Sequence, residues 1–277
     1  MAVLYHDIEN DGLYDGYKEN NYLQEKGAKG EQAVRDLLVE SLSEEYLVLN
    51  SIYSRTDDGD FTEIDHVLLH SKFILCIETK HYSGDMKALD LETWEQRNRK
   101  NGETIKIDSP QQQSVHHAYS LNGYLESIDI QIPIYTVVVF VNDKTVSFDE
   151  SSDQYYKSEC PVIYMKNLLH LIEVLEHLHL NDQGNSTDVK NIADQILDEH
   201  QGIKNSQLFW CKKSAMNEND REAQYILGQM YLSGYYEEGD RLIRIKSNER
   251  AALYWLTKAS KRGHKLARQA LNRYYNN

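Results

Sequence analysis

EIDHVLLHSKFILCIETK, residues 63–80, is the stretch of sequence that decides the fold. Each half is rich in Ile, Val, Leu and Phe and is too short for an ordinary helix. The stretch therefore predicts two buried strands joined by a turn at residues 71–72. The Ser-Lys pair at this turn differs from the Asn-Gly type that a two-residue turn prefers, so a longer loop that shifts the pairing by a residue or two is the alternative.

Four polar side chains gather at one end of this hairpin. A two-residue turn places Asp65 opposite Glu78 and Glu63 opposite Lys80, and because strand side chains alternate, all four share one face. Two carboxylates at that distance share a proton unless a cation separates them, and hard oxygen ligands favour magnesium or manganese. The ammonium cannot ligate the metal, but it can hold a water or a developing oxyanion. A cross-strand salt bridge between buried strands is the alternative interpretation.

The composition of the 277 residues is that of a soluble globular protein. The longest apolar run, residues 132–141, is well short of a membrane span, and no apolar signal core is present near Met1. Three cysteines far apart in the sequence predict reduced, structural thiols in a cytoplasmic protein, without a disulfide frame or a zinc site. We therefore expect neither membrane insertion nor secretion.

The negative charge is concentrated in the first part of the chain. Residues 1–180 hold 15 Lys and Arg against 32 Asp and Glu, a formal charge of 15 − 32 = −17. Residues 181–277 hold 15 against 12, a charge of +3. An acidic first part argues against broad, nonspecific affinity for DNA.

Outside the hairpin, the pattern alternates between helices and strands. A helix over 28–43 opens at the glycines of 27–30 and puts Glu31 in its first turn, where a carboxylate favours the helix N-terminus. The other predicted strands are 46–53, 132–141 and 162–165, the other helices are 110–126 and 168–180, and short strands are expected within 86–107. This order predicts an α/β fold with a mixed sheet flanked by helices.

The chain divides by composition into four parts. They are an N-terminal arm over 1–26, an α/β domain over 27–182, a linker helix over 183–204, and a helical part over 205–277; the loop-like residues 181–188 mark the boundary between the domain and the linker.

Four pieces of sequence, taken in order, resemble the nuclease-related domain (NERD), a branch of the restriction-endonuclease-like PD-(D/E)xK superfamily. The pieces are Gly30-Glu31, Glu63-Ile-Asp65-His66, Ile77-Glu78-Thr79-Lys80 with Ser83-Gly84 behind it, and Pro110-Gln-Gln-Gln113 followed by His117. The resemblance covers residues 26–145 and implies a restriction-endonuclease-like mixed sheet. Thr79 departs from the pattern, because these domains often have an apolar residue there.

The resemblance also implies a metal-dependent catalytic site. By that resemblance, Asp65 and Glu78 ligate Mg2+ or Mn2+, and Glu31 is a further acid that ligates directly or through water. Lys80 would orient the attacking water or stabilise charge on the phosphate, and Gln113 would position water, metal or substrate. The metal would serve as a Lewis acid and a source of activated water.

Residues 205–277 resemble Sel-like repeats, which are relatives of the tetratricopeptide repeat. Residues 210–215 and 255–260 are similar segments 45 residues apart, and such self-similarity indicates stacked helical hairpins. The loop over 235–247 is longer than is usual in these repeats. The resemblance implies binding of a protein partner, or self-association, through this part.

Together these features predict a metal-dependent nuclease that hydrolyses phosphodiester bonds in DNA, in a setting such as bacterial defence against phage. RNA cleavage is a variant of the same prediction. The alternative is a catalytically inactive nuclease fold that acts as an interaction or sensor protein through its helical repeats.

Overall fold

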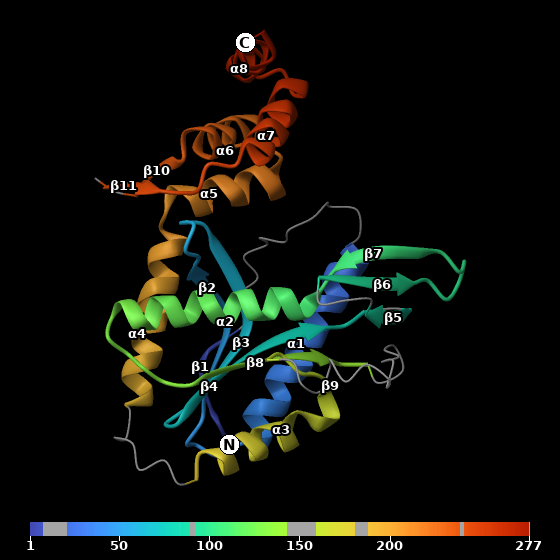
Figure 1. Cartoon of the computed structure of the whole chain (residues 1–277), viewed down its shortest axis with the longest axis vertical. Helices are drawn as coiled ribbons and strands as arrows, with labels where there is room; N and C mark the ends of the chain where they lie inside the picture. The colour runs from blue at the N-terminus through green and yellow to red at the C-terminus, as the bar shows by residue number, and fades with distance from the viewer. Residues whose placement is uncertain are drawn as a thin grey trace. The chain divides into compact units, whose positions relative to one another are not determined.

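The computed structural model describes residues 1–7, 21–82, 84–88, 92–142, 159–180, 188–238 and 241–276 (Figure 1). These residues form two compact units. The first contains the described residues of 1–9, 21–54 and 62–197, and the second those of 55–61 and 198–277. Half of the predicted N-terminal arm (8–20), residue 83 of the family pattern and most of the predicted boundary loop at 181–188 lie outside the described residues.

The first unit is built on a six-stranded mixed sheet in the order β1-β2-β3-β4-β8-β9. Its elements are β1 (Val3–His6), α1 (Asn21–Ser41), β2 (Leu47–Arg55), β3 (Phe61–His70), β4 (Phe73–Lys80), β5 (Asp85–Ala88), β6 (Thr93–Arg97), β7 (Thr104–Asp108), α2 (Pro110–Ser127), β8 (Ile134–Phe140), β9 (Val162–Tyr164), α3 (Leu168–Leu178) and α4 (Val189–Lys204). β4 is antiparallel to β3 and parallel to β8, which is in turn parallel to β9. The predicted mixed α/β architecture is confirmed.

The central hairpin has the predicted two-residue turn. His70 pairs with Phe73, and the ladder continues to His66 opposite Ile77. One more step of the same register brings Asp65 beside Glu78. Pairing between the two strands ends at His66 and Ile77, before Glu63 is reached. Glu63 and Lys80, which were predicted to lie opposite each other, are therefore outside the paired part of the hairpin.

The two faces of the sheet are covered by different helices, as the period-two alternation of β4 requires. Leu75 and Ile77 pack in a core with side chains of α1 and α3. Ile74 and Cys76 point to the opposite face and pack in a core with side chains of α2 and α4. Glu78 continues this second series, so it projects on the side of the sheet that α2 covers.

β5, β6 and β7 form a small three-stranded antiparallel sheet, which confirms the short strands expected within 86–107. The fully buried Trp94 stacks on Phe140 of β8, with ring centroids 6.0 Å apart. Gly102 lies in the turn between β6 and β7 with φ 74°, a conformation that glycine adopts without strain.

The prediction for the first helix is wrong in one respect. α1 begins at Asn21, so Glu31 lies ten residues inside it and cannot act as a carboxylate at the helix N-terminus. Glycine is permissive without forcing a helix end, and Gly30 has a packing role here: a Cβ on it would lie 2.9 Å from the Cβ of His81. The short edge strand β1, parallel to β2, was not predicted.

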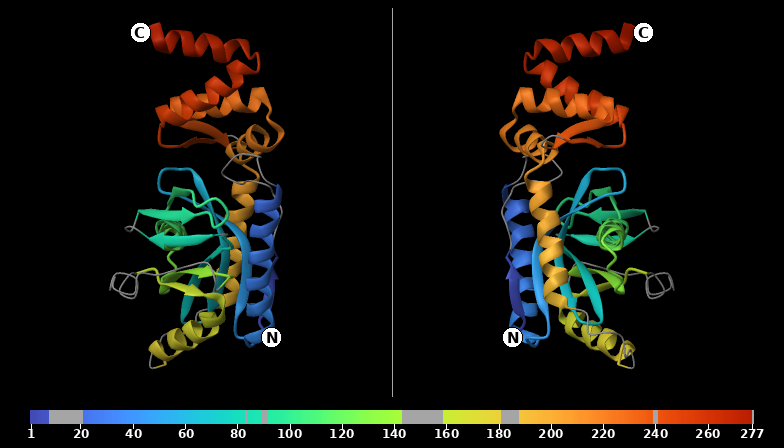
Figure 2. Two further views of the ribbon diagram at one scale, coloured as in Figure 1. Left: turned by 90° about the vertical axis from the view of Figure 1, so that its right-hand side faces the viewer. Right: turned by 90° about the vertical axis from the view of Figure 1, so that its left-hand side faces the viewer.

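The second unit is mainly helical (Figure 2). Its elements are α5 (Gln207–Lys213), a π-helical turn (Ser214–Glu218), α6 (Arg221–Ser233), β10 (Tyr235–Glu238), β11 (Arg241–Arg244), α7 (Glu249–Lys261) and α8 (Lys265–Asn276). The long loop expected over 235–247 holds the β10–β11 hairpin. A Cβ on Gly228 would lie 2.8 Å from Leu256 Cγ, so a small residue lets α6 and α7 approach closely. Assignment of this helical region to Sel-like repeats stays a prediction.

All three cysteines are buried and free, as the predicted structural thiols require. Within the described parts of the chain, no helix combines the length and the apolar character needed to cross a membrane.

Candidate active site

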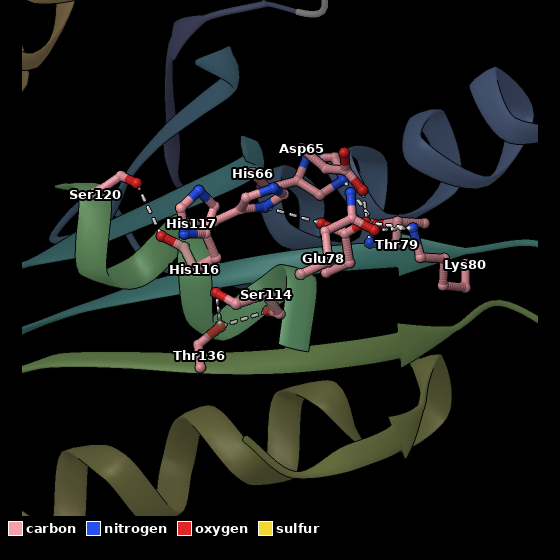
Figure 3. Close-up of polar contacts among 11 residues, drawn as sticks. Asp65, His66, Glu78, Thr79, Lys80, Ser114, His116, His117, Ser120 and Thr136 are labelled. Atoms are coloured by element: carbon pink, nitrogen blue, oxygen red, sulfur yellow. Dashed lines mark hydrogen bonds and ion pairs between the residues drawn. The ribbon is translucent and has the colours of Figure 1, made fainter. Parts of the chain in front are cut away.

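The five predicted site residues come from four elements and meet near the end of the β3–β4 hairpin. They are Glu31 of α1, Asp65 of β3, Glu78 and Lys80 of β4, and Gln113 of α2. The Nζ atom of Lys80 contacts Glu78 Oε1 and lies 3.0 Å from Gln113 Oε1. The negative charge of Glu78 raises the pKa of both Glu31 and Asp65, and the charge of Glu31 also raises that of Asp65. Figure 3 shows Asp65, Glu78 and Lys80 lying together.

Asp65 is held in place by the neighbouring strand. The backbone N–H of Thr79 donates a hydrogen bond of 2.7 Å to Asp65 Oδ2. Burial raises the pKa of Asp65 well above its ordinary value, and the negative charges of Glu78 and Glu31 raise it further. Lys80 and the Thr79 hydrogen bond offset only part of this effect. The side chain therefore holds a proton more tightly than an exposed aspartate does, as expected for a buried carboxyl group with other carboxylates nearby.

Glu78 is the buried centre of the cluster. Burial alone would raise its pKa, but the ammonium of Lys80 and the ring of His117 lower it to about 2. His117 Nδ1 lies 3.1 Å from Glu78 Oε2, which is an ion-pair distance, although the contact lacks the alignment of a hydrogen bond. Glu78 is thus ionised, with the Lys80 ammonium at Oε1 and the His117 ring beside Oε2.

The pKa values of Glu31 and of Lys80 are both raised, for different reasons. Burial raises the pKa of Glu31, the negative charge of Glu78 raises it further, and Lys80 lowers it. Burial alone would lower the pKa of Lys80, yet the charges of Glu78, Tyr82 and Asp65, together with the hydrogen bond to Glu78, outweigh burial and raise it. The lysine is therefore a permanent cation at neutral pH.

α2 carries two side chains to this site. Gln113 and His117 are four residues apart, so they lie on one face of the helix. Their helix begins at Pro110 after Ser109, which caps it, and Ser114 Oγ lies 2.5 Å from Thr136 Oγ1 of β8 (Figure 3). The sequence did not predict a role for His117, but its spacing from Gln113 was the signal that would have found it.

A buried polar chain supports the site from the other face of the sheet. His66 Nδ1 lies 2.7 Å from Asn50 Oδ1, and His66 Nε2 lies 3.1 Å from Thr79 Oγ1. The amide of Asn50 donates to the His6 carbonyl at 2.9 Å, so its oxygen accepts from a protonated Nδ1, and Nε2 accepts from the Thr79 hydroxyl. Burial lowers the pKa of His66 to about 3, which keeps the ring neutral.

The donor set fits a hard divalent cation in its chemistry. Glu31, Asp65 and Glu78 offer oxygen ligands, and the pKa values of Glu31 and Asp65 are raised first by burial and then by the negative charge of Glu78, which a bound cation would offset. As the side chains stand, no three His, Cys, Asp or Glu residues of the described ranges are grouped as a metal-binding set.

Comparison with known sequences agrees with the assignment of this region. Residues 26–141 match the nuclease-related domain family, NERD. These residues contain all five of the predicted site side chains. The match supports a nuclease-related function for the first unit.

One curated relative is an uncharacterised protein of Bacillus anthracis. It is 36% identical to this chain over 59 residues, which make up 21% of this chain and 28% of that protein. The chain thus matches little more than a quarter of the length of this relative. No solved structure matches the chain.

Proposed function

We propose that this protein is a metal-dependent nuclease that hydrolyses phosphodiester bonds in DNA. The observation that carries the proposal is the meeting of two carboxylates and an ammonium: Thr79 holds Asp65 beside Glu78, and Lys80 bridges Glu78 to Gln113. The match of residues 26–141 to a nuclease-related family supports the reaction class.

In this proposal Asp65 and Glu78 hold Mg2+ or Mn2+, with Glu31 as a further acid. The ion would supply Lewis-acid chemistry and a water of lowered pKa. The chain contributes the rest: Asp65 would ligate as the carboxylate, and the Lys80 ammonium is positioned to stabilise negative charge on a phosphate. Gln113 fixes the direction of the lysine through its 3.0 Å contact with Nζ.

The test is a cleavage assay on plasmid, single-stranded DNA and RNA, each with Mg2+, Mn2+ or EDTA. We expect cleavage of DNA by the wild type with either metal, and none by Asp65→Asn or Lys80→Ala. Circular dichroism checks that both variants are folded, because loss of Lys80 leaves the buried Glu78 with one partner fewer. Equal, metal-independent nicking by the wild type and both variants would contradict the proposal.

A second candidate function is that of an inactive nuclease fold that acts through binding. The observation that favours it is the compensation of Glu78 by Lys80 and His117 without any metal. Isothermal titration with Mg2+ and Mn2+ separates the two candidates. Uptake that disappears in Asp65→Asn favours the nuclease, and no uptake by the wild type favours the binding protein.

The setting is also part of the proposal. Three free, buried cysteines support a reducing compartment such as the cytoplasm. A role in bacterial defence rests on the family resemblance, as does binding of a protein partner through residues 205–277. Plating phage on bacteria that express the wild type or Asp65→Asn tests the first, since only the wild type should lower plaque counts.

A further inference from the structure

The last two helices of the second unit carry an exposed basic surface. Residues 249–276 hold seven Lys and Arg and a single acid, Glu249, whose carboxylate accepts a hydrogen bond from the Tyr274 hydroxyl. Six of the basic side chains are exposed: Arg250, Lys261, Arg262, Lys265, Arg268 and Arg273. None of these six side chains forms an ion pair with any residue that the structure describes.

Helical spacing collects several of these charges into stripes. On α7, Arg250, Tyr254, Lys258 and Lys261 recur at intervals of four, four and three residues, which puts them on one side of the helix. Lys258 Nζ lies 4.6 Å from the centroid of the Tyr254 ring, so cation and aromatic ring share this stripe.

α8, which follows the end of α7, also carries basic side chains together with an exposed aromatic ring (Figure 2). Lys265, Arg268 and Tyr275 follow at intervals of three and seven residues, and all three are exposed. The buried side of the helix is marked by Ala267, which packs against Leu256 and Ala259 of α7. Tyr275 is 69% exposed, and its ring meets that of Tyr274 in a T-shaped contact with centroids 5.3 Å apart, so this pair of rings lies at the surface.

We infer that α7 and α8 form a nucleic-acid-binding surface that contacts the phosphodiester backbone without reading its sequence. Unpaired Lys and Arg side chains neutralise phosphates and release counterions, while exposed aromatic rings stack on bases of any identity. This binding role goes beyond the proposed hydrolysis. The first 180 residues have a formal charge of −17 and by themselves repel a polyanion. The basic surface of α7 and α8 would supply the attraction to nucleic acid that this acidic part lacks.

The charge count fixes the expected salt dependence. If six side chains each neutralise one phosphate of duplex DNA, the logarithm of the binding constant falls with a slope of about −5 against the logarithm of salt concentration. Affinity would then drop about 1,000-fold between 50 mM and 200 mM salt.

The experiment measures fluorescence anisotropy of labelled duplex DNA, single-stranded DNA and RNA with the full chain, over a series of salt concentrations. EDTA is present throughout, so that binding is measured without hydrolysis. The test variant is K261Q/K265Q/R268Q. Its control is K87Q/K106Q/K190Q, which changes the net charge equally at three exposed lysines of the first unit.

We expect the test variant to bind at least tenfold more weakly than the wild type in 50 mM salt, with the slope reduced by about 3, while the control stays close to wild type. Tighter binding of single strands than of duplex, lost in Tyr275→Leu, would support stacking. K261R/K265R keeps the charge and should retain affinity, which separates loss of charge from loss of folding.

The inference is overturned if the test variant binds nucleic acid like the wild type, or if the control loses as much affinity. Stronger binding to phosphatidylserine vesicles than to any nucleic acid would also overturn it. Because EDTA suppresses metal-dependent chemistry, a failed cleavage assay and a failed binding assay give separate answers.

Discussion

Asp65 Oδ2 on β3 accepts a hydrogen bond of 2.7 Å from the backbone N–H of Thr79 on β4. The contact lies just beyond the last pair of the ladder, His66 opposite Ile77. It closes the end of the hairpin and fixes Asp65 beside Glu78, where the two carboxylates repel each other. The fold therefore holds an acid where its charge is unfavourable, an arrangement that is concentrated at functional sites.

The first prediction concerns the free energy of unfolding of Asp65→Asn. Because burial and the charges of Glu78 and Glu31 raise the pKa of Asp65, its ionised form destabilises the metal-free chain at neutral pH. Asparagine removes the charge and keeps an oxygen that accepts from Thr79. We expect a gain of about 1 kcal/mol in urea unfolding at pH 7.5, together with loss of metal uptake and cleavage. Asp57→Asn, at an exposed aspartate, is the control and should change neither property.

The second prediction is the pH dependence of metal binding. A folded pKa above the unfolded value means that the proton on Asp65 stabilises the fold at low pH, and that this contribution is lost as pH rises through the folded pKa. Metal requires the deprotonated carboxylate, so binding releases protons and strengthens with pH. Titration with Mn2+ at pH 5.5 and 8 should give tighter binding at the higher pH. An affinity that is independent of pH would show that Asp65 is not a ligand.

The hairpin and most of its surroundings were predictable because strand alternation and turn length are local properties. His70 opposite Phe73 fixes the register, and the register fixes which acids meet. The spacing of His117 from Gln113 places both on one face of α2, but the contact of His117 with Glu78 also depends on the packing of α2 against β4 and β8, which spacing alone does not give. The start of α1 was missed for a different reason: glycines such as Gly30 suggest a helix end, but tertiary packing against His81 overrides that preference.

The third prediction separates two neighbouring glutamines on α2. Gln113 contacts Lys80 at 3.0 Å, whereas Gln112 is exposed and supplies only a backbone N–H to the helix cap. Gln113→Ala should lower the cleavage rate by about 10- to 100-fold, as the loss of a positioning contact does. Gln112→Ala should cleave like the wild type. Because the Gln113 side chain is itself exposed, neither variant should change the melting temperature much.

The fourth prediction tests the buried chain through His66. Its pKa is about 3 in the fold against an ordinary 6.5, because burial disfavours the charged ring. Because the pKa of His66 is lower in the folded state, its contribution to the free energy of unfolding is complete above pH 6.5. That contribution is lost as the pH falls toward 3. Between pH 7 and 5 the wild type should lose about 2 kcal/mol through this group. His66→Gln should show a correspondingly shallower loss in urea unfolding, and His116→Gln, at an exposed site on α2, is the control.

The fifth prediction uses the two glycines inside α1. A Cβ on Gly30 would lie 2.9 Å from the Cβ of His81, so Gly30→Ala must move α1 relative to the end of β4. Glu31 is the next residue, and its displacement should weaken metal uptake and cleavage by at least tenfold, in line with the precision that supporting residues provide. The nearest atom to a Cβ on Gly27 is Glu31 Oε1 at 3.9 Å, an ordinary contact.

Gly27→Ala is therefore the matched control, and alanine should stabilise the helix there by about 0.5–1 kcal/mol because it is the better helix former. The pair is informative because the two substitutions are chemically identical and three residues apart. If Gly30→Ala cleaves DNA and takes up metal as well as Gly27→Ala does, the close approach of α1 to His81 has no part in positioning Glu31. If Gly30→Ala alone loses both properties while its circular dichroism stays native, α1 delivers the third acid to the site.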